Sequence, residues 1–298
     1  MQTGLGLRTL GACLGAALLA ACAAEENGTT GSLTLGVTDA PVDQAAEVVM
    51  SFTGVTVKPA EGPAVERSFE EARSVDLLAL TGAAREKLLD GVAIPAGAYS
   101  WIRLHVAAER GATDSYLMRN GEKHSLYVPS GGQTGLKLVR GFTLQEDGKA
   151  DFTVDFELRK SIHQPQSGSG YQLRPSLRLV DNSSTGHLEG VVSGSYVTNK
   201  CGGSGNGLAV YVYAGADATP VDLDGREPEP VTTALVEQDD ENGAYAYAAG
   251  YLPKGDYTVA FTCKADNDDP ELDDSDVGLR DAANVEIVAG ETTTHDFP

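Results

Sequence analysis

The feature that most constrains the fold is a stretch in which apolar and polar residues alternate one by one from Asp151 to Leu158. Its two sets of positions are Phe152, Val154, Phe156 and Leu158, and Asp151, Thr153, Asp155 and Glu157. Successive side chains of an extended strand point to opposite faces, so period-two alternation is typical of a strand with one buried face. The stretch therefore predicts a β-strand that covers an apolar core.

Similar short runs recur along the chain and predict strands almost throughout. In the first half they are Ser32–Val37, Val48–Val57, Trp101–Val106, Leu126–Val128, Leu136–Val139 and Leu173–Val180. In the second half they are Leu188–Ser193, Leu208–Ala214, Thr232–Val236, Ala244–Ala248, Tyr257–Cys263, Val285–Val288 and Thr292–Phe297. A short helix is expected over Ala83–Leu89, and Ile94–Tyr99 is expected to be a turn that leads into a strand.

A polar link at Asp181–Gly186 separates the two sets of runs. Most acidic clusters lie beyond it. We therefore expect an all-β protein with two β-sandwich domains in tandem, at residues 31–181 and 187–298.

The N-terminal segment differs from the rest. Arg8 is its only charge, and an apolar run that is too short to span a bilayer follows over Leu10–Ala21. Leu19-Ala20-Ala21-Cys22 resembles the bacterial lipobox. The resemblance implies that residues 1–21 are a lipoprotein signal peptide and that Cys22 is lipidated, which gives a membrane anchor. An ordinary secretory signal with a chance cysteine is the alternative. Residues 22–30 are expected to be a flexible tether, and Ala23 favours the outer membrane by the sorting rule of enteric lipoproteins.

The net charge of −21 argues against nucleic-acid partners, because a strongly acidic surface repels a polyanion. Cys13 would leave with the signal peptide, so that Cys201 and Cys263 remain. Export would place these two thiols in an oxidising compartment. We therefore predict a Cys201–Cys263 disulfide, which would stabilise by roughly 4 kcal/mol for a loop of about 60 residues.

Residues 31–181 resemble domain-of-unknown-function family 4382, which occurs in bacterial lipoproteins. The matching stretches, in order, are Val37–Pro41, Val48–Val57, Asp76–Leu80, Ile94–Tyr99 with Ile102–Leu104, Thr134–Val139, Asp155–Ile162 and Leu173–Leu179. The family name carries no activity, so the resemblance implies a location and domain limits, not a reaction.

Residues 187–298 resemble prealbumin-like sandwiches of the carboxypeptidase regulatory-like or Cna-B-like kind. The matching stretches are Gly190–Gly194, Ala209–Val212, Gly243–Tyr247 and Leu252–Val259. The resemblance implies a spacer or a partner-binding role. Some Cna-B domains contain a Lys–Asn cross-link, which we do not expect here because Thr292–Phe297 holds no Asn.

Motifs for nucleophilic, zinc-hydrolytic or phosphate-binding chemistry do not occur in the sequence. The five histidines, at 105, 124, 163, 187 and 295, are scattered. Asp155 and Glu157 share one strand face and are candidates for an acid–base pair, although a solvent-facing row is the favoured interpretation. Asp39 is expected to cap a turn before Ala40-Pro41.

Two binding sites are further candidates. Clustered carboxylates predict a calcium site, because calcium takes six to eight oxygen ligands; they are Asp266, Asp268, Asp269, Asp273, Asp274 and Asp276. A plain acidic loop is the alternative. Tyrosines in period-two pairs, Tyr211 with Tyr213 and Tyr245 with Tyr247, are candidates for a sugar-binding platform.

Together these patterns predict a non-catalytic cell-envelope lipoprotein that acts as a binding or scaffold module without a cofactor. A carbohydrate-binding lipoprotein that uses the C-terminal sandwich is the alternative. The expected partners are the membrane, through the lipid, and an envelope glycan or protein.

Overall fold

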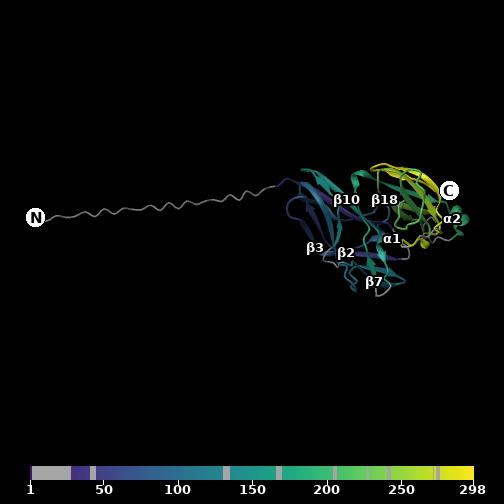
Figure 1. Ribbon diagram of the computed structural model, residues 1–298, viewed down its shortest axis with the longest axis horizontal. Helices are drawn as coiled ribbons and strands as arrows, with labels where there is room; N and C mark the ends of the chain where they lie inside the picture. The colour runs from purple at the N-terminus through teal and green to yellow at the C-terminus, as the bar shows by residue number, and fades with distance from the viewer. Residues whose placement is uncertain are drawn as a thin grey trace.

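The computed structural model describes Met1 and residues 28–40, 45–129, 135–165, 170–203, 207–226, 228–239, 243–270, 272 and 276–298. The chain is mostly β, as the alternation predicts, and its sheets form two pairs (Figure 1). We call residues 30–181 the N-terminal unit and residues 182–298 the C-terminal unit. Most of the expected signal peptide, Cys22 and most of the expected tether lie outside the described residues.

The N-terminal unit consists of a four-stranded sheet, in the order β13-β10-β1-β4, and a nine-stranded sheet. The path of the larger sheet is β11-β12-β7-β6-β2-β5-β8, with β3 beside β2 and β9 beside β5. Its elements are β1 (Thr30–Ala40), β2 (Glu47–Pro59), β3 (Val65–Asp76), η1 (Leu77–Ala79), β4 (Glu86–Pro95), β5 (Gly97–Val106), β6 (Tyr116–Arg119), β7 (Glu122–Tyr127), β8 (Leu136–Leu138), β9 (Phe142–Leu144), β10 (Lys149–Glu157), α1 (Leu158–Ser161), β11 (Ile162–His163), β12 (Tyr171–Leu173) and β13 (Leu177–Asp181).

The two sheets of this unit share one apolar core. Residues of β1, β2, β5 and β10 meet there, and Phe52 of β2 contacts Phe156 of β10 edge to face at 6.3 Å between ring centres. β1 lies between β10 and β4, and it pairs with β10 in parallel from Ser32–Lys149 to Ala40–Glu157.

Edge strands β3 and β4 meet along one side of the N-terminal unit. Arg73 of β3 donates to the carbonyl oxygen of Leu88 at 2.9 Å, and Arg67 donates to that of Ala93 at 3.3 Å. An open strand edge is a template for pairing with other chains, so these arginines occupy carbonyls that would otherwise be available.

The C-terminal unit is a sandwich of two four-stranded sheets, β17-β18-β14-β21 and β16-β15-β19-β20. Phe261 and Phe297 pack in the core between them, with ring centres 5.7 Å apart and ring planes tilted by 41°. β14 pairs with β21 in parallel. The elements are η2 (Asn182–Ser184), β14 (Thr185–Val192), α2 (Gly194–Cys201), β15 (Ala209–Ala214), β16 (Thr232–Leu235), β17 (Glu237–Gln238), β18 (Tyr245–Pro253), β19 (Gly255–Thr262), η3 (Ala265–Asn267), β20 (Arg280–Ile287) and β21 (Thr292–Thr294).

Both units contain the same tight hairpin. Tyr99 donates its hydroxyl to the carbonyl of Pro95 at 2.6 Å, and Tyr257 donates to that of Pro253 at 2.7 Å. The turn predicted at Ile94–Tyr99 is thereby confirmed as the junction of β4 and β5.

One local expectation is wrong. The helix expected at Ala83–Leu89 is absent, because Glu86–Pro95 extends as β4 beside β1, and this pairing overrides the local sequence preference. Asp39 is a buried residue of β1, opposite Phe156, and the residues from Pro41 onward that would form the expected turn lie outside the described residues.

Candidate functional site

The polar face of β10 is the best candidate for chemistry, because it gathers ionisable groups away from solvent. Asp155 and Glu157 are only 3% and 5% exposed. The solvent-facing row favoured from the sequence is therefore wrong. The strand alternates as predicted, but residues of the C-terminal unit lie over its polar face: burial raises the pKa of Tyr251 of that unit, and the charges of Asp151 and Asp155 add to the rise.

One arginine serves both buried carboxylates. Arg178 of β13 stands opposite Asp155 in the antiparallel pair. Its guanidinium donates to Oδ2 of Asp155 and lies 3.5 Å from Oε1 of Glu157. Arginine can bridge two oxygens in this way because its nitrogens form a planar fork.

Burial raises the pKa of Glu157 to about 8, and the neighbouring charge of Asp155 adds to the rise. Burial also raises the pKa of Asp155, although Arg178 opposes the shift. Removing a carboxylate from water disfavours its charged form, and one arginine neutralises only one of two carboxylates. The pair therefore holds a proton near neutral pH.

The exposed end of the same face carries a second ion pair. Arg85 contacts Asp151 at two points, Nη1–Oδ1 at 2.6 Å and Nη2–Oδ2 at 3.0 Å. Asn182, in the link between the units, donates to Oδ1 of Asp151 at 2.8 Å. These hydrogen bonds outweigh desolvation and lower the pKa of Asp151.

Beyond β10, helix α1 extends the polar face into a buried contact between the units. Arg159 Nη1 donates to the Tyr211 hydroxyl at 2.6 Å and lies 3.4 Å from Oδ2 of Asp268. Tyr211 in turn donates to the same carboxylate, and the backbone amide of Leu223 donates to its other oxygen at 3.2 Å. Lys160 adds an ion pair with Glu229 at 2.7 Å. We call the group Arg159, Tyr211 and Asp268 the buried triad.

A second contact lies at the loop before β4. Tyr251 of β18 donates its hydroxyl to the carbonyl of Ala83 at 2.8 Å. A Cβ on Gly250 would stand 1.8 Å from the carbonyl oxygen of Gly82, so only glycine permits this approach. Contacts between the units therefore include the buried triad and the approach of β18 to the loop before β4.

Access distinguishes this acid pair from a catalytic one. A general acid or base must come within hydrogen-bond reach of a substrate. The three main cavities of the described chain have volumes of about 480, 300 and 570 Å³, and neither Asp155 nor Glu157 lines any of them. The arrangement suits an interface more than an active site.

The tyrosines do not form the predicted platform. Tyr211, Tyr213 and Tyr247 are 0%, 1% and 4% exposed, and Tyr245 is half-buried. Tyr213 donates to the carbonyl of Val221, and Tyr247 donates to that of His295 at 2.6 Å. This expectation is wrong because both pairs contribute to packing.

Of the candidate calcium ligands, Asp266, Asp268 and Asp269 line one cavity of about 300 Å³. Asp268 belongs to the buried triad, and Asp276 pairs with Lys264 at 2.7 Å. Asp273 and Asp274 lie outside the described residues. Within the described part of the chain, no three His, Cys, Asp or Glu side chains gather into a group that could hold a metal ion.

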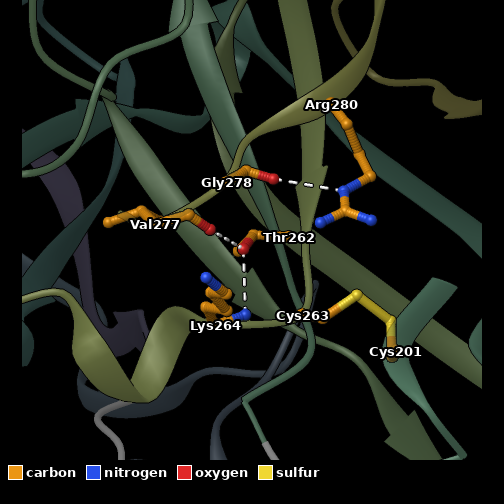
Figure 2. Close-up of a disulfide and its surroundings, with 7 residues drawn as sticks. All are labelled: Cys201, Thr262, Cys263, Lys264, Val277, Gly278 and Arg280. Atoms are coloured by element: carbon orange, nitrogen blue, oxygen red, sulfur yellow. Dashed lines mark hydrogen bonds between the residues drawn. A yellow bond between two sulfur atoms is a disulfide. The ribbon is translucent and has the colours of Figure 1, made fainter. Parts of the chain in front are cut away.

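The predicted Cys201–Cys263 disulfide is present, and it joins the end of α2 to the end of β19 with Cα atoms 5.4 Å apart (Figure 2). Beside it, Thr262 donates to the carbonyl of Val277 and accepts from the amide of Lys264 at 2.9 Å. The covalent bond therefore sits among contacts that fix the end of β19.

Sequence reasoning missed the arginines that complete the site. Arg85, Arg159 and Arg178 are scattered along the chain, and no spacing pattern links them to β10. Only strand register brings Arg178 opposite Asp155. The one local signal was the placement of Arg178 in the alternating run Leu177-Arg178-Leu179.

The family comparison matches most of the N-terminal unit. Residues 30–175 match DUF4382, a domain of unknown function. The DUF4382 match covers the strands from β1 to β12 and includes the acidic face of β10. No curated protein matches the chain.

Solved structures show only a distant similarity to this chain. They include the TIE protein of Bacillus anthracis (14% identity, TM-score 0.20, 90% of this chain and 33% of that one). The minor pilin GBS52 of Streptococcus agalactiae is 12% identical with a TM-score of 0.19, over 89% of this chain and 94% of that one. A structure described as an adhesin, from Bacteroides ovatus ATCC 8483, is 9% identical with a TM-score of 0.20, over 98% of this chain and 99% of that one. The chain thus spans about a third of the TIE protein. Among the residues described, no helix is long and apolar enough to cross a bilayer.

Proposed function

We propose that this chain is a non-catalytic binding or scaffold module of the cell envelope, in which the two units are domains held together as one body. The observation that carries the proposal is the buried triad. Glu157 and Asp268, whose pKa values are raised by burial, adjoin or form a joint between the units, and both carboxylates contact arginines of the protein.

A scaffold benefits from such a joint because a force or a bound ligand on one domain then also acts on the position of the other domain. Contacts between domains in one chain are usually modest, and relative motion is the default. Here Arg159 and Asp268 are 5% and 0% exposed at their side chains, and Tyr251 adds a hydrogen bond at a second place. Two separate contacts restrict rotation about either one.

Calorimetry of the full chain tests the joint. We expect one cooperative unfolding transition for the wild type and two transitions for a variant that combines Arg159→Ala with Tyr251→Phe. Two independent transitions in the wild type would contradict the scaffold proposal. Turnover of a glycoside or ester substrate that is lost in Glu157→Gln would contradict the non-catalytic part.

Attachment to the envelope is the second part of the proposal, and it rests on the sequence Leu19-Ala20-Ala21-Cys22. Several acyl chains together hold a protein stably on a membrane. We expect the N-terminal peptide from membrane fractions to carry lipid on Cys22, and Cys22→Ser to release the protein into the soluble fraction. An unmodified N-terminus would contradict the anchor.

A further inference from the structure

The outer face of the large N-terminal sheet carries a group of basic residues on a strongly acidic protein. Trp101 and Arg103 of β5 point away from the core, as does Lys137 of β8. Arg103 stands directly opposite Lys137 in the antiparallel pair. The chain as a whole has 43 acidic and only 22 basic residues, so two adjacent cations require an explanation.

Like charges that face each other across two strands destabilise a sheet. Neither Arg103 nor Lys137 has a hydrogen bond or ion pair with any described residue, and the Nε atom of Arg103 is buried without a partner. The neighbouring polar groups are occupied: His105 hydrogen-bonds Thr56 at 2.6 Å, and Lys58 donates to the carbonyls of Pro59 and Gly62.

Trp101 holds the two cations in place. The Arg103 guanidinium lies 4.9 Å from the Trp101 ring centre, and the Lys137 ammonium lies 4.8 Å from it. Contacts of this kind are attractive because the ring face carries partial negative charge. They fix the two side chains without neutralising them, which leaves a preorganised pair of positive charges.

We propose that Arg103 and Lys137 bind carboxylate groups of an acidic polysaccharide. The proposal rests on the binding function proposed above and names its partner class. The fork of an arginine matches a carboxylate in two-point contact, and a lysine supplies a point charge beside it. Val139, which follows β8 and is 78% exposed, offers apolar surface next to the pair.

Charge complementarity favours a glycan over other polyanions. The net charge of −21 repels a densely charged polymer at long range, whereas a chain with one carboxylate per sugar presents fewer charges to that field. Neighbouring strands are about 4.8 Å apart, so the two cations are spaced to contact one or two carboxylates of a polymer that crosses the sheet.

Titration calorimetry of the full chain with polygalacturonate oligomers tests the proposal. We expect binding by the wild type that weakens as salt increases, and no binding of the fully methyl-esterified oligomers. Arg103→Gln and Lys137→Gln should each weaken binding about tenfold, which corresponds to about 1.4 kcal/mol.

Lys137→Glu separates binding from folding. It gives Arg103 a carboxylate within the protein, so we expect the melting temperature to stay or rise while binding is lost. Lys123→Gln is the matched control, because Lys123 lies 3.6 Å from the ring of Tyr116 in the same sheet but faces Met118 rather than a second cation.

Absence of wild-type binding, binding unchanged in Arg103→Gln and Lys137→Gln, or equal binding of inorganic polyphosphate would overturn the assignment. A failure here leaves the scaffold proposal intact if the wild type still unfolds in one transition, so the two results are distinguishable.

Discussion

Arg159 and Asp268 are separated by 109 residues in the chain, yet they form an ion pair whose two side chains are almost completely buried. The guanidinium comes from the helix that follows β10, and the carboxylate comes from the residue after η3. Tyr211 hydrogen-bonds both. The ion pair thus joins a positive charge of the N-terminal unit to a negative charge of the C-terminal unit, and each unit supplies the partner that the other unit's charge needs.

Removing one partner of this pair should be costly, because it leaves the other charged group buried without compensation. We expect Arg159→Met to lower the free energy of unfolding by about 3–5 kcal/mol in urea denaturation. Adding Asp268→Leu should restore much of the loss. The control is Asp276→Asn at the exposed pair with Lys264, where the cost should stay below about 1 kcal/mol. Equal losses at both pairs would contradict this account.

The acid pair makes stability depend on pH in a defined direction. The pKa of Glu157 is about 8 in the folded protein against 4.5 for the free group, so the folded state keeps a proton that the unfolded state releases. This stabilising effect is complete below pH 4.5 and is lost as the pH rises through 8. Between pH 7 and 9 we expect the free energy of unfolding to fall by roughly 1 kcal/mol.

Glu157→Gln should flatten that decline, since glutamine stays neutral throughout. Exposed Glu189 of β14 provides the control, and Glu189→Gln should leave the pH profile unchanged. Unfolding curves at pH 7, 8 and 9 measure the effect. A profile in Glu157→Gln as steep as the wild type would show that another group is responsible.

The two units approach each other so closely at Gly250 that a side chain at this position should not fit. In Gly250→Ala the new Cβ would meet the carbonyl oxygen of Gly82, so the loop before β4 must move. We expect a lower melting temperature and faster proteolysis of this loop. Gly194→Ala is the matched control, because its nearest neighbour would be 3.8 Å away. Unchanged proteolysis would mean that the loop moves at little cost.

The disulfide should stabilise the C-terminal unit by about 2–4 kcal/mol. We expect Cys201→Ser with Cys263→Ser to lower the free energy of unfolding by that amount and to speed amide hydrogen exchange in α2, whose last residue is Cys201. Exchange in β1 serves as the internal reference. Loss of protection in β1 as large as that in α2 would indicate global rather than local destabilisation.

The strands could be predicted because half-buried strands repeat with period two, and β5 and β14 are examples. β3 was not predicted, because eleven of its twelve residues are half-buried or exposed and charged residues occur on both of its faces. Helix α2 was also missed, although the sequence contains its signals. Ser193 caps the first turn by accepting from the amide of Tyr196, and Gly202 ends the helix in the left-handed conformation.

Burial of the acidic face could not be predicted, because a polar strand face looks the same whether water or another unit covers it. Asp155 and Glu157 are buried by Arg178 of their own unit and by the approach of Tyr251 of β18. The same reasoning applies to Tyr211, whose period-two partner Tyr213 is also buried. Tertiary geometry decides which residues make contacts between the units. The sequence gives the types of these residues but not their contacts.

The parallel pairing of β1 with β10 has a consequence for the order of folding. β1, the first strand of the unit, lies between β10 and β4, and β10 ends at Glu157. β1 therefore cannot pair with both of its neighbours until the chain as far as Glu157 is present. β14 and β21 repeat this arrangement in the C-terminal unit. Contacts between distant parts of a chain slow folding. A chain that folds from its N-terminus therefore leaves each sheet incomplete until a late segment becomes available.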